Sequence, residues 1–307
     1  MGDIGACEEE VNMRCSNSRA ISGIVVACIA VLFGGNGVGE TRPSQNAVAL
    51  RVMTYNIHHA EGLDGKVDLD RIAAVIRAAD ADVVCLQEVD RDLPRTQHLD
   101  FPRLLGEKLG MTVVFDPNYQ FDGGDYGNAT LTRIAVTSFE NLKLPAPQGI
   151  EPRGCLRTTV RLGTHTVDIL NAHLGLDEKQ RQEQASAILK SLRDVPTVLA
   201  GDMNEPATSP GVSALLTRLR DTAEKNAARK SGPSPAEKTT PKIDFIFVSK
   251  DVEVLSCRVL ATPETAASDH LPYVAEVSVR TPPDKAANDG IYDNDDERVT
   301  DAITEGN

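Results

Sequence analysis

The stretch "VLAGDMNEP", residues Val198–Pro206, is a short apolar run that ends abruptly on the carboxylate of Asp202. An amide, Asn204, follows two residues later. The residues before Asp202 are typical of a buried β-strand. A lone carboxylate at the end of such a strand is unfavourable by several kcal/mol unless it is paired or binds a metal. We therefore expect Asp202 to find partners from distant parts of the chain.

Strand-like and helix-like segments alternate on both sides of this stretch. Apolar runs of strand length, rich in β-branched and aromatic residues, lie at 50–57, 82–88, 111–115, 165–174, 196–202, 242–249 and 271–279. Amphipathic helical patterns lie at 68–80, 177–194 and 209–221. Strands mixed with helices in this way indicate an α/β or α+β layered domain.

Local signals refine these segments. Asp68 is a candidate N-cap of the first helix, with Asp70 as the alternative, and Ser209 is the expected cap of the third. Glycine, proline and small polar residues cluster at 122–128 ("DGGDYGN") and at 230–242, which predicts surface loops near one rim.

The two halves of the domain also resemble one another. Residues 52–59, a helix and residues 83–90 are matched by residues 167–174, a helix and residues 197–204. This internal similarity suggests two related strand–helix–strand units packed face to face. Chance similarity among apolar strands is the alternative.

Polar side chains recur where the predicted strands end. They are Asn56, Glu88, His173, Asp202 with Asn204, and the pair Asp269 and His270. Strands of one sheet end together, so these side chains can converge on one rim. Each has an ordinary structural interpretation when it is taken singly: a solvated loop, a hydrogen-bonded core histidine or a helix cap. Their combination in one order is more specific.

Seven motifs carry a resemblance to a known family. They are "TYNI", "LQEVD", "YGNATLTR", "NAHL", "GDMNEP", "IDFIFVS" and "SDHLPY", which run from about residue 50 to residue 279. With these motifs the sequence resembles the endonuclease/exonuclease/phosphatase superfamily. The resemblance implies an α/β fold, a four-layer sandwich of two mixed β-sheets packed face to face with helices on the outside. It also implies a hydrolase of phosphoester bonds that depends on a divalent metal.

The resemblance also implies a metal site. Glu88 would be the principal ligand, Asn56 would bind the ion or its water through the side-chain carbonyl, and Asp269 would complete the edge of the site. Hard cations prefer such oxygen ligands. The expected ion is Mg²⁺, with Mn²⁺ or Ca²⁺ as alternatives.

The catalytic groups implied by the resemblance lie across the cleft. Asp244 would fix the tautomer of His270, and either His270 or Asp202 would be the general base. Asn204 would orient Asp202 and donate a hydrogen bond to a phosphoryl oxygen, and His173 would donate another. No covalent nucleophile is required.

Other polar residues near these motifs are open to more than one interpretation. Asn128 can contact phosphate or shape a loop. Arg153 and Arg157 flank a predicted strand start, where a surface ion pair is favoured over a phosphate clamp. His58 and His59 follow Asn56 directly, and one interpretation places them in the cleft wall.

Three segments are expected. Residues 1–47 form a signal peptide or anchor with a linker, residues 48–280 the catalytic domain, and residues 281–307 an acidic disordered tail, which carries about six of the net charges in the formal total of −13. Arg14 and Arg19 precede an apolar run at 20–33, a secretory pattern that is short for a membrane span. We therefore expect a secreted or extracytoplasmic protein (periplasmic if bacterial), with a membrane anchor as the alternative.

Composition and absent motifs limit the classes of function that the sequence supports. A lysine and arginine stripe with interleaved aromatics is lacking, which weighs against nucleic acid as the favoured partner. The motifs of serine hydrolases, zincins and P-loop nucleotide triphosphatases are absent. The leading hypothesis is a secreted phosphodiesterase or phosphatase that acts on a small or lipid-linked phosphoester. We expect a monomer that contacts a membrane only through its N-terminal segment or through a lipid substrate. The alternatives are an extracellular nuclease for DNA or RNA and a non-catalytic binding module.

Overall fold

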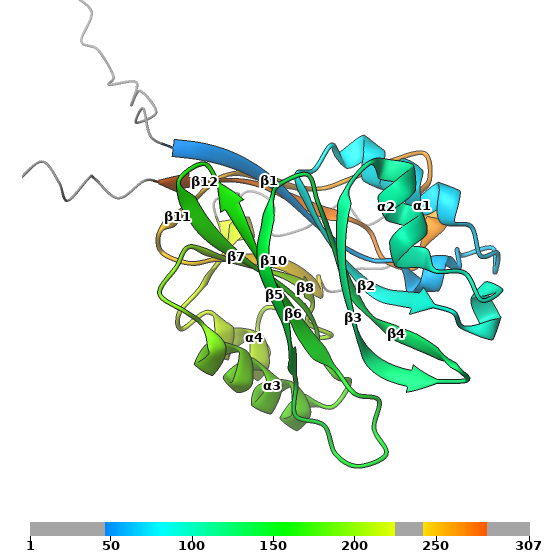
Figure 1. The fold of residues 1–307 in the computed structure, drawn as a ribbon. Helices are drawn as coiled ribbons and strands as arrows, with labels where there is room; N and C mark the ends of the chain where they lie inside the picture. The colour runs from blue at the N-terminus through cyan, green and yellow to red at the C-terminus, as the bar shows by residue number, and fades with distance from the viewer. Residues whose placement is uncertain (1–46, 225–241, 281–307) are drawn as a thin grey trace, which may run out of the picture. The chain divides into compact units, whose positions relative to one another are not determined.

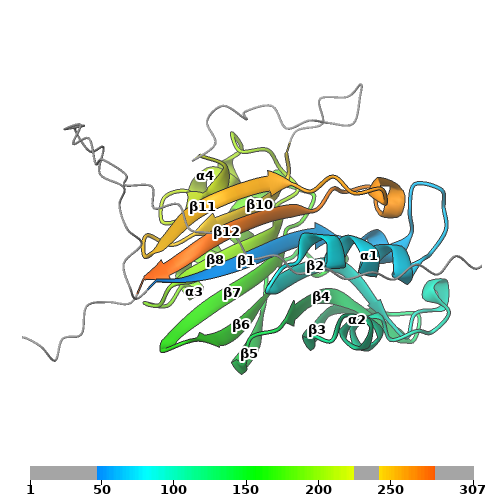
Figure 2. The same cartoon turned by 90° about the horizontal axis from the view of Figure 1, so that it is seen from above.

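Two six-stranded β-sheets form the framework of the protein (Figures 1 and 2). The computed structural model describes residues 47–224 and 242–280. The expected leader, most of the loop at 230–242 and the expected tail lie outside the described residues. Within the described part, none of the helices has the length and apolar character needed to cross a membrane.

The first sheet has the strand order β11-β12-β1-β2-β4-β3, and the second has β5-β6-β7-β8-β10-β9. The strands are β1 Ala47–Asn56, β2 Val83–Arg91, β3 Thr112–Phe121, β4 Gly124–Thr132, β5 Val136–Lys143, β6 Gly154–Leu162, β7 His165–His173, β8 Thr197–Asp202, β9 Arg220–Asp221, β10 Asp244–Val248, β11 Val252–Val259 and β12 Tyr273–Arg280. The helices are α1 Leu69–Ala79, α2 Phe101–Leu109, α3 Glu178–Ser191 and α4 Pro210–Leu215, with short 3-10 turns at η1 His58–Ala60, η2 Pro94–Thr96 and η4 Thr265–Ala267.

The two sheets repeat one pattern. Each contains a parallel pair, β1 with β2 and β7 with β8, and every other pairing is antiparallel. Helix α1 connects the first parallel pair and α3 connects the second. The internal similarity of the sequence therefore corresponds to two related β–α–β units.

Three apolar cores separate four layers. One core packs α1 and α2 against the first sheet, a second fills the space between the sheets, and a third packs α3 and α4 against the second sheet. Figures 1 and 2 show the two helix pairs on opposite outer sides. The predicted four-layer sandwich is confirmed.

All seven predicted strands are present, and α1 and α3 lie where helical patterns were found. Asp68 caps α1, since its side chain accepts from the backbone N–H groups of Asp70 and Arg71. Helix α4 ends at Leu215, earlier than predicted, and Ser209 makes no side-chain capping bond. Periodicity did not reveal α2.

The prediction of a surface loop at 122–128 is wrong. Residues 124–132 form β4, a strand that is buried throughout between β2 and β3. The glycines that suggested a loop allow close packing instead: a Cβ on Gly127 would lie 2.9 Å from the backbone nitrogen of Asn118. Glycine within a strand can mark such an approach of two backbones.

The two-residue period of the strands determines which side chains reach the space between the sheets. In β1, Leu50 and Val52 belong to the inter-sheet core, whereas Met53 and Tyr55 pack toward the helices. The same alternation directs Asn56 toward the second sheet. The inner face of β1 therefore changes from aliphatic to polar at its end.

The same change occurs in β8 of the second sheet. Val198 and Ala200 belong to the inter-sheet core, and Asp202 is the next residue on that face. Gly201 lies between them with a φ of +155°, and a Cβ there would be 1.8 Å from the carbonyl oxygen of Ala172. Only glycine allows β7 and β8 to approach this closely next to Asp202.

A buried amide network joins the sheets beneath this polar end. The Asn171 side chain donates from Nδ2 to the carbonyl oxygens of Leu86 and Ala129, each at 3.0 Å, and accepts from Gln87 Nε2 at 2.8 Å. Asn128 Nδ2 in turn donates to the carbonyl oxygen of Asn171 at 3.0 Å. Asn171 comes from the second sheet and its side-chain partners from the first, so its amide cross-links the two sheets.

Replacing this amide by an apolar group of similar size should be costly. We expect Asn171→Leu to lower the free energy of unfolding by about 3 kcal/mol or more, because two carbonyls and the Gln87 amide lose a buried partner. Urea denaturation followed by circular dichroism measures the change. Gln148→Leu, an amide-to-leucine change in an exposed loop, is the control. Equal stability of the two variants would contradict the assigned role of Asn171.

Candidate active site

Asp202 lies at the centre of the polar end of the sandwich. Its carboxylate is 1 % exposed. Oδ2 accepts from Asn56 Nδ2 at 3.1 Å, and Oδ1 accepts from the backbone N–H of Asn204 at 2.8 Å. Asn56 belongs to the first sheet and Asp202 to the second, so the site is formed by both sheets. The expectation that Asp202 has distant partners is confirmed.

Two imidazoles face the same carboxylate oxygen. His173 Nε2 and His270 Nε2 each lie 3.6 Å from Asp202 Oδ2. His173 is the direct partner of Asp202 in the parallel pairing of β7 with β8. A separation of 3.6 Å is longer than an ordinary hydrogen bond, so both nitrogens remain available to a substrate.

The protonation state of His270 depends on Asp244. Asp244 Oδ2 accepts from His270 Nδ1 at 2.9 Å, and Asp244 is the cross-strand neighbour of Asp202. Burial lowers the pKa of His270, but the hydrogen bond and charge of Asp244, with the charges of Asp202 and Asp269, outweigh it and raise that pKa to about 9. The imidazole is therefore cationic at neutral pH.

The pKa of Asp202 is raised as well. Burial, followed by repulsion from the Asp244 carboxylate, raises the pKa of Asp202 to about 6, although His270, Asn204 and Asn56 act in the opposite direction. A carboxylate with this pKa is ionised at neutral pH and is a stronger base than an exposed aspartate. At pH 7 the site thus contains an anionic Asp202 beside a cationic His270.

His173 has a neutral imidazole whose tautomer is set by Arg153. Burial, the Arg153 charge and the His270 charge hold the pKa of His173 well below its usual range. Arg153 Nη1 lies 3.1 Å from His173 Nδ1. A guanidinium can only donate, so Nδ1 accepts and the proton of His173 is on Nε2, the nitrogen that faces Asp202.

Arg153 was missed as a site residue. The predicted ion pair is present, with Glu151 Oε1 at 2.6 Å, but the arginine is buried rather than on the surface, and its Nη1 also lies against His173. Arg157 is buried as well, and it pairs with Glu140 and with Asp168, far from Asp202 in the sheet. Spacing within the sequence did not distinguish the two arginines.

Glu88 reaches the site through an irregularity in β2. The register of β2 against β4 shifts between Leu86 and Val89, and Glu88 has a φ of +58°. A bulge of this kind redirects a side chain next to a functional site. Asn56 Nδ2 donates to Glu88 Oε1 at 2.8 Å, which places the carboxylate beside the amide.

Asn56 presents its amide nitrogen, rather than its carbonyl oxygen, to the two carboxylates. Its Oδ1 accepts from the backbone N–H of His58 at 3.0 Å. A direct bond from Oδ1 to a metal ion, as the resemblance implies, would require the amide to turn over. That role of Asn56 stays a prediction.

The structure places Asp269 at the rim of the site. Its side chain is exposed, and Ser268 Oγ lies 3.4 Å from Asp269 Oδ1. The Ser268 hydroxyl is also 2.8 Å from the backbone carbonyl oxygen of Asn56, which anchors this loop to the end of β1. Asp269 as a metal ligand remains a prediction.

Asn204 supports Asp202 through its backbone. It has a φ of +52°, and its side-chain Nδ2 donates to the carbonyl oxygen of Leu174 at 2.9 Å. The predicted orientation of Asp202 by Asn204 therefore occurs through the backbone N–H. Asn128 does not contact the site with its amide: Nδ2 donates to the backbone carbonyl oxygens of Gly154 and Asn171 between the sheets. Its role is therefore structural, but within β4 and not in a loop as expected.

The donor set fits a divalent cation. Among the described residues, two groups of side chains bring three potential ligand atoms within 4.8 Å of one another: His58 with His59 and Glu88, and Asp202 with Asp244 and His270. Carboxylate oxygens and neutral imidazoles are suitable ligands for divalent cations. Of the predicted metal ligands, Glu88 is the one that belongs to such a group.

Similarity to known proteins agrees with this geometry. The chain is 26% identical over 254 residues to the uncharacterized protein YbhP of Escherichia coli strain K12, which covers 75% of this chain and 96% of YbhP. The crystal structure of an endonuclease/exonuclease/phosphatase from Beutenbergia cavernae DSM 12333 is 29% identical, has a TM-score of 0.65, and matches 76% of this chain and 72% of that chain. The mannosyl-6-phosphatase of Bacteroides thetaiotaomicron VPI-5482 shares the fold at 21% identity and a TM-score of 0.61, over 74% of this chain and 99% of that chain.

The model of the Endonuclease/Exonuclease/phosphatase family matches residues 53–270, a span that includes the whole second sheet, most of the first sheet and every residue of the site from Asn56 to His270. The chain therefore belongs to the endonuclease/exonuclease/phosphatase family, whose members are generally divalent-metal-dependent hydrolases of phosphoesters.

Proposed function

We propose that this protein is a secreted hydrolase that cleaves a small or lipid-linked phosphoester with the help of a divalent cation. The observation that carries this proposal is the convergence on Asp202 of Asn56, His173 and His270 from both halves of the chain. Hydrolysis of a phosphoester needs a general base, donors for the phosphoryl oxygens and neutralisation of negative charge. These residues can supply the first two.

We assign the general base to Asp202. Its carboxylate is ionised near neutral pH, and the backbone N–H of Asn204 fixes its orientation. His270 was the other candidate, but its proton is retained at neutral pH by Asp244. His270 is therefore better suited to stabilise the developing negative charge than to accept a proton from water.

The phosphoryl group would be bound by N–H donors. His173 Nε2 carries a proton, and His270 Nε2 carries another in the cationic state. Arg153 lies behind His173 and adds positive charge at the base of the site. These groups match a tetrahedral anion beside Asp202, as charge stabilisation in such reactions requires.

Glu88, Asn56 and Asp269 are the residues that we propose would hold the divalent cation, Mg²⁺ or alternatively Mn²⁺ or Ca²⁺. The bound cation would polarise a phosphoryl oxygen and neutralise part of its charge. Asn56 donates to Glu88 and to Asp202 and so links the proposed metal ligand to the proposed base. To bind the cation through Oδ1, this amide would turn over and release both carboxylates.

The substrate class and location rest on the sequence. The sequence lacks a stripe of lysine and arginine with interleaved aromatics, which favours a small or lipid-linked ester over DNA or RNA. The apolar run at 20–33 supports secretion, and we expect the protein to act as a monomer. An extracellular nuclease is the second candidate, since nucleic acid is also a phosphodiester.

Removing a proposed catalytic group should abolish most of the turnover. We expect Asp202→Asn and His270→Ala each to reduce kcat by roughly a hundredfold or more, through loss of the base or of charge stabilisation. Hydrolysis of an aryl phosphodiester with Mg²⁺ measures the change. Asp251→Asn and His98→Ala alter exposed residues and serve as controls. Near-normal turnover in Asp202→Asn would refute Asp202 as the base.

The pH dependence should be bell-shaped. Activity needs an ionised Asp202 and a protonated His270, so kcat/KM should rise through about pH 6 and fall through about pH 9. In Asp244→Asn both limbs should move to lower pH, because the Asp244 carboxylate raises both pKa values. An alkaline limb that does not move in this variant would contradict the pairing of Asp244 with His270.

A screen of phosphoesters tests the substrate class. The purified protein with Mg²⁺ should hydrolyse a small or lipid-linked ester among sugar phosphates, inositol phosphates, sphingomyelin-like lipids and an aryl phosphodiester, and plasmid DNA should be a poor substrate. Glu88→Gln should abolish the activity, since the amide is a weaker metal ligand than the carboxylate. Preferential cleavage of DNA or RNA would favour the nuclease instead.

A further inference from the structure

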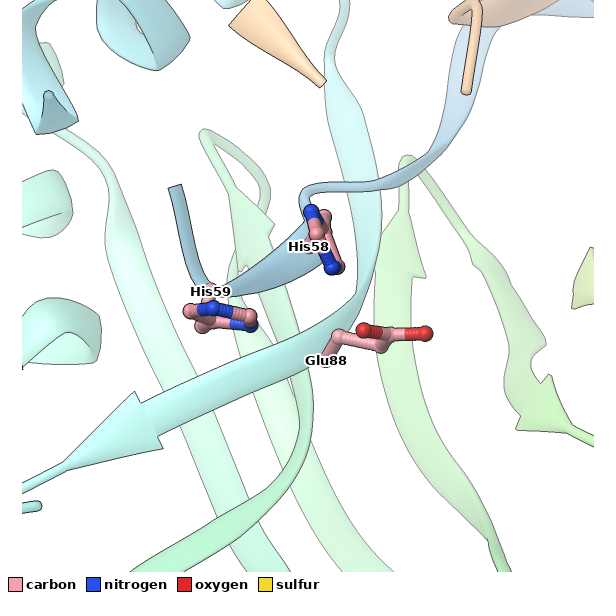
Figure 3. Close-up of side chains that lie close together, drawn as sticks. All are labelled: His58, His59 and Glu88. Atoms are coloured by element: carbon pink, nitrogen blue, oxygen red, sulfur yellow. The ribbon is translucent and has the colours of Figure 1, made fainter. Parts of the chain in front are cut away.

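Two adjacent histidines next to Glu88 have no part in the chemistry proposed above. His58 and His59 form the turn η1 directly after β1. Their ring centroids are 4.5 Å apart, and one ring nitrogen of each lies with a Glu88 carboxylate oxygen in a group whose atoms are all within 4.8 Å of one another. Figure 3 shows both rings next to the Glu88 side chain.

The hydrogen bonds of this turn determine which nitrogen of each ring carries a proton. His58 Nδ1 lies 3.1 Å from the backbone carbonyl oxygen of Glu61, and His59 Nε2 lies 3.3 Å from Glu61 Oε2. A carbonyl and a carboxylate can only accept, so each of these nitrogens is a donor. When the rings are neutral, the lone pairs are therefore at His58 Nε2 and His59 Nδ1.

A histidine that binds a metal usually has this arrangement. Its second nitrogen donates to a backbone carbonyl or a carboxylate, which fixes the tautomer and the orientation of the ring. Here one residue, Glu61, provides both acceptors. His58 and His59 are thus oriented in the way that metal ligands are.

An unsatisfied nitrogen gives independent support. His59 is 8% exposed, and its Nδ1 is buried with no hydrogen-bond partner among the described residues. A buried polar atom without a partner is rare in folded proteins, because it has lost its bond to water without replacement. A cation bound to this lone pair would satisfy it.

The backbone of the turn is also unusual. His58, His59 and Ala60 have φ values of 46°, 42° and 62°, in the left-handed region that residues other than glycine rarely adopt. Strained conformations of this kind cluster at ligand and active sites. In this turn the conformation brings two consecutive imidazoles to the same carboxylate.

We propose that His58, His59 and Glu88 bind a transition-metal cation such as Zn²⁺. Imidazole nitrogen favours cations of this class over Mg²⁺. Metal bonds of about 2.1 Å require the three ligand atoms to approach to within roughly 4 Å of one another. The three ligand atoms lie within 4.8 Å of one another, so small rotations of all three side chains would be needed. The proposal goes beyond the hydrolytic function and shares only Glu88 with it.

Zinc binding tests this site without reference to turnover. The metal-free full chain would be titrated with ZnCl₂ in excess MgCl₂ by isothermal titration calorimetry. Wild type should bind one Zn²⁺ that is lost, or at least about tenfold weaker, in each of His58→Asn and His59→Asn. His98→Asn, which removes an exposed histidine elsewhere, should bind as wild type does. Any zinc bound by cysteines elsewhere should be the same in every variant.

Zinc binding that is equal in wild type, His58→Asn and His59→Asn would overturn the proposal. If circular dichroism shows that the variants do not fold, anomalous diffraction from wild-type crystals grown with ZnCl₂ replaces them. A peak bonded to His58, His59 and Glu88 is expected, and a map without a peak among these residues would reject the site. Zinc binding without phosphoester hydrolysis would leave this inference intact and refute the proposed function. Hydrolysis without zinc binding at these residues would refute this inference and leave the proposed function intact.

Discussion

The site depends on the way the two sheets are joined at one end. Along most of their length the two sheets are held together by a mainly aliphatic core. Apolar contacts are not directional, so this core does not by itself define how one sheet is positioned on the other. At the polar end the Asn171 amide bonds to backbone carbonyls of the opposite sheet and to Gln87. These directional bonds define one relative position of the sheets, and that position allows Asn56 of β1 to reach Asp202 of β8.

Burial of the carboxylates gives the site its chemistry. Asp202 is held by hydrogen bonds in a buried environment beside a second carboxylate, Asp244, and burial raises its pKa. Asp244 in turn keeps a proton on His270. Burial and the Arg153 charge lower the pKa of His173 and keep the imidazole neutral, and Arg153 directs its proton toward the site. The Asp202 anion, the His270 cation and the neutral His173 donor thus lie within a few ångströms of each other. The protonation state of each is set by its neighbours.

Four of the residues assigned to function adopt strained backbone conformations. Glu88, Asn204, His58 and His59 all have positive φ, although none of them is glycine. Such conformations are unfavourable unless the surrounding structure compensates for them. Here the bulge in β2, the backbone bond to Asp202 and the bonds to Glu61 provide that compensation.

The sequence by itself determined seven of the twelve strands in the described part of the chain, two of the helices and most of the site, because apolar periodicity and polar residues at strand ends are local properties. The four-layer class followed from the resemblance of its motifs to a known family. It identified Asn56, Glu88, His173, Asp202 and His270 as side chains at strand termini. Tertiary structure decided which nitrogen of each histidine is protonated, why Asn128 is structural, and why Arg153 rather than Arg157 belongs to the site. It also decided that residues 124–128 are a buried strand, because the backbone of β3 packs against Gly127 and the backbone of Arg91 and Asp92 against Gly124. These outcomes depend on contacts between residues far apart in the chain, and such contacts exist only after the two sheets have packed together.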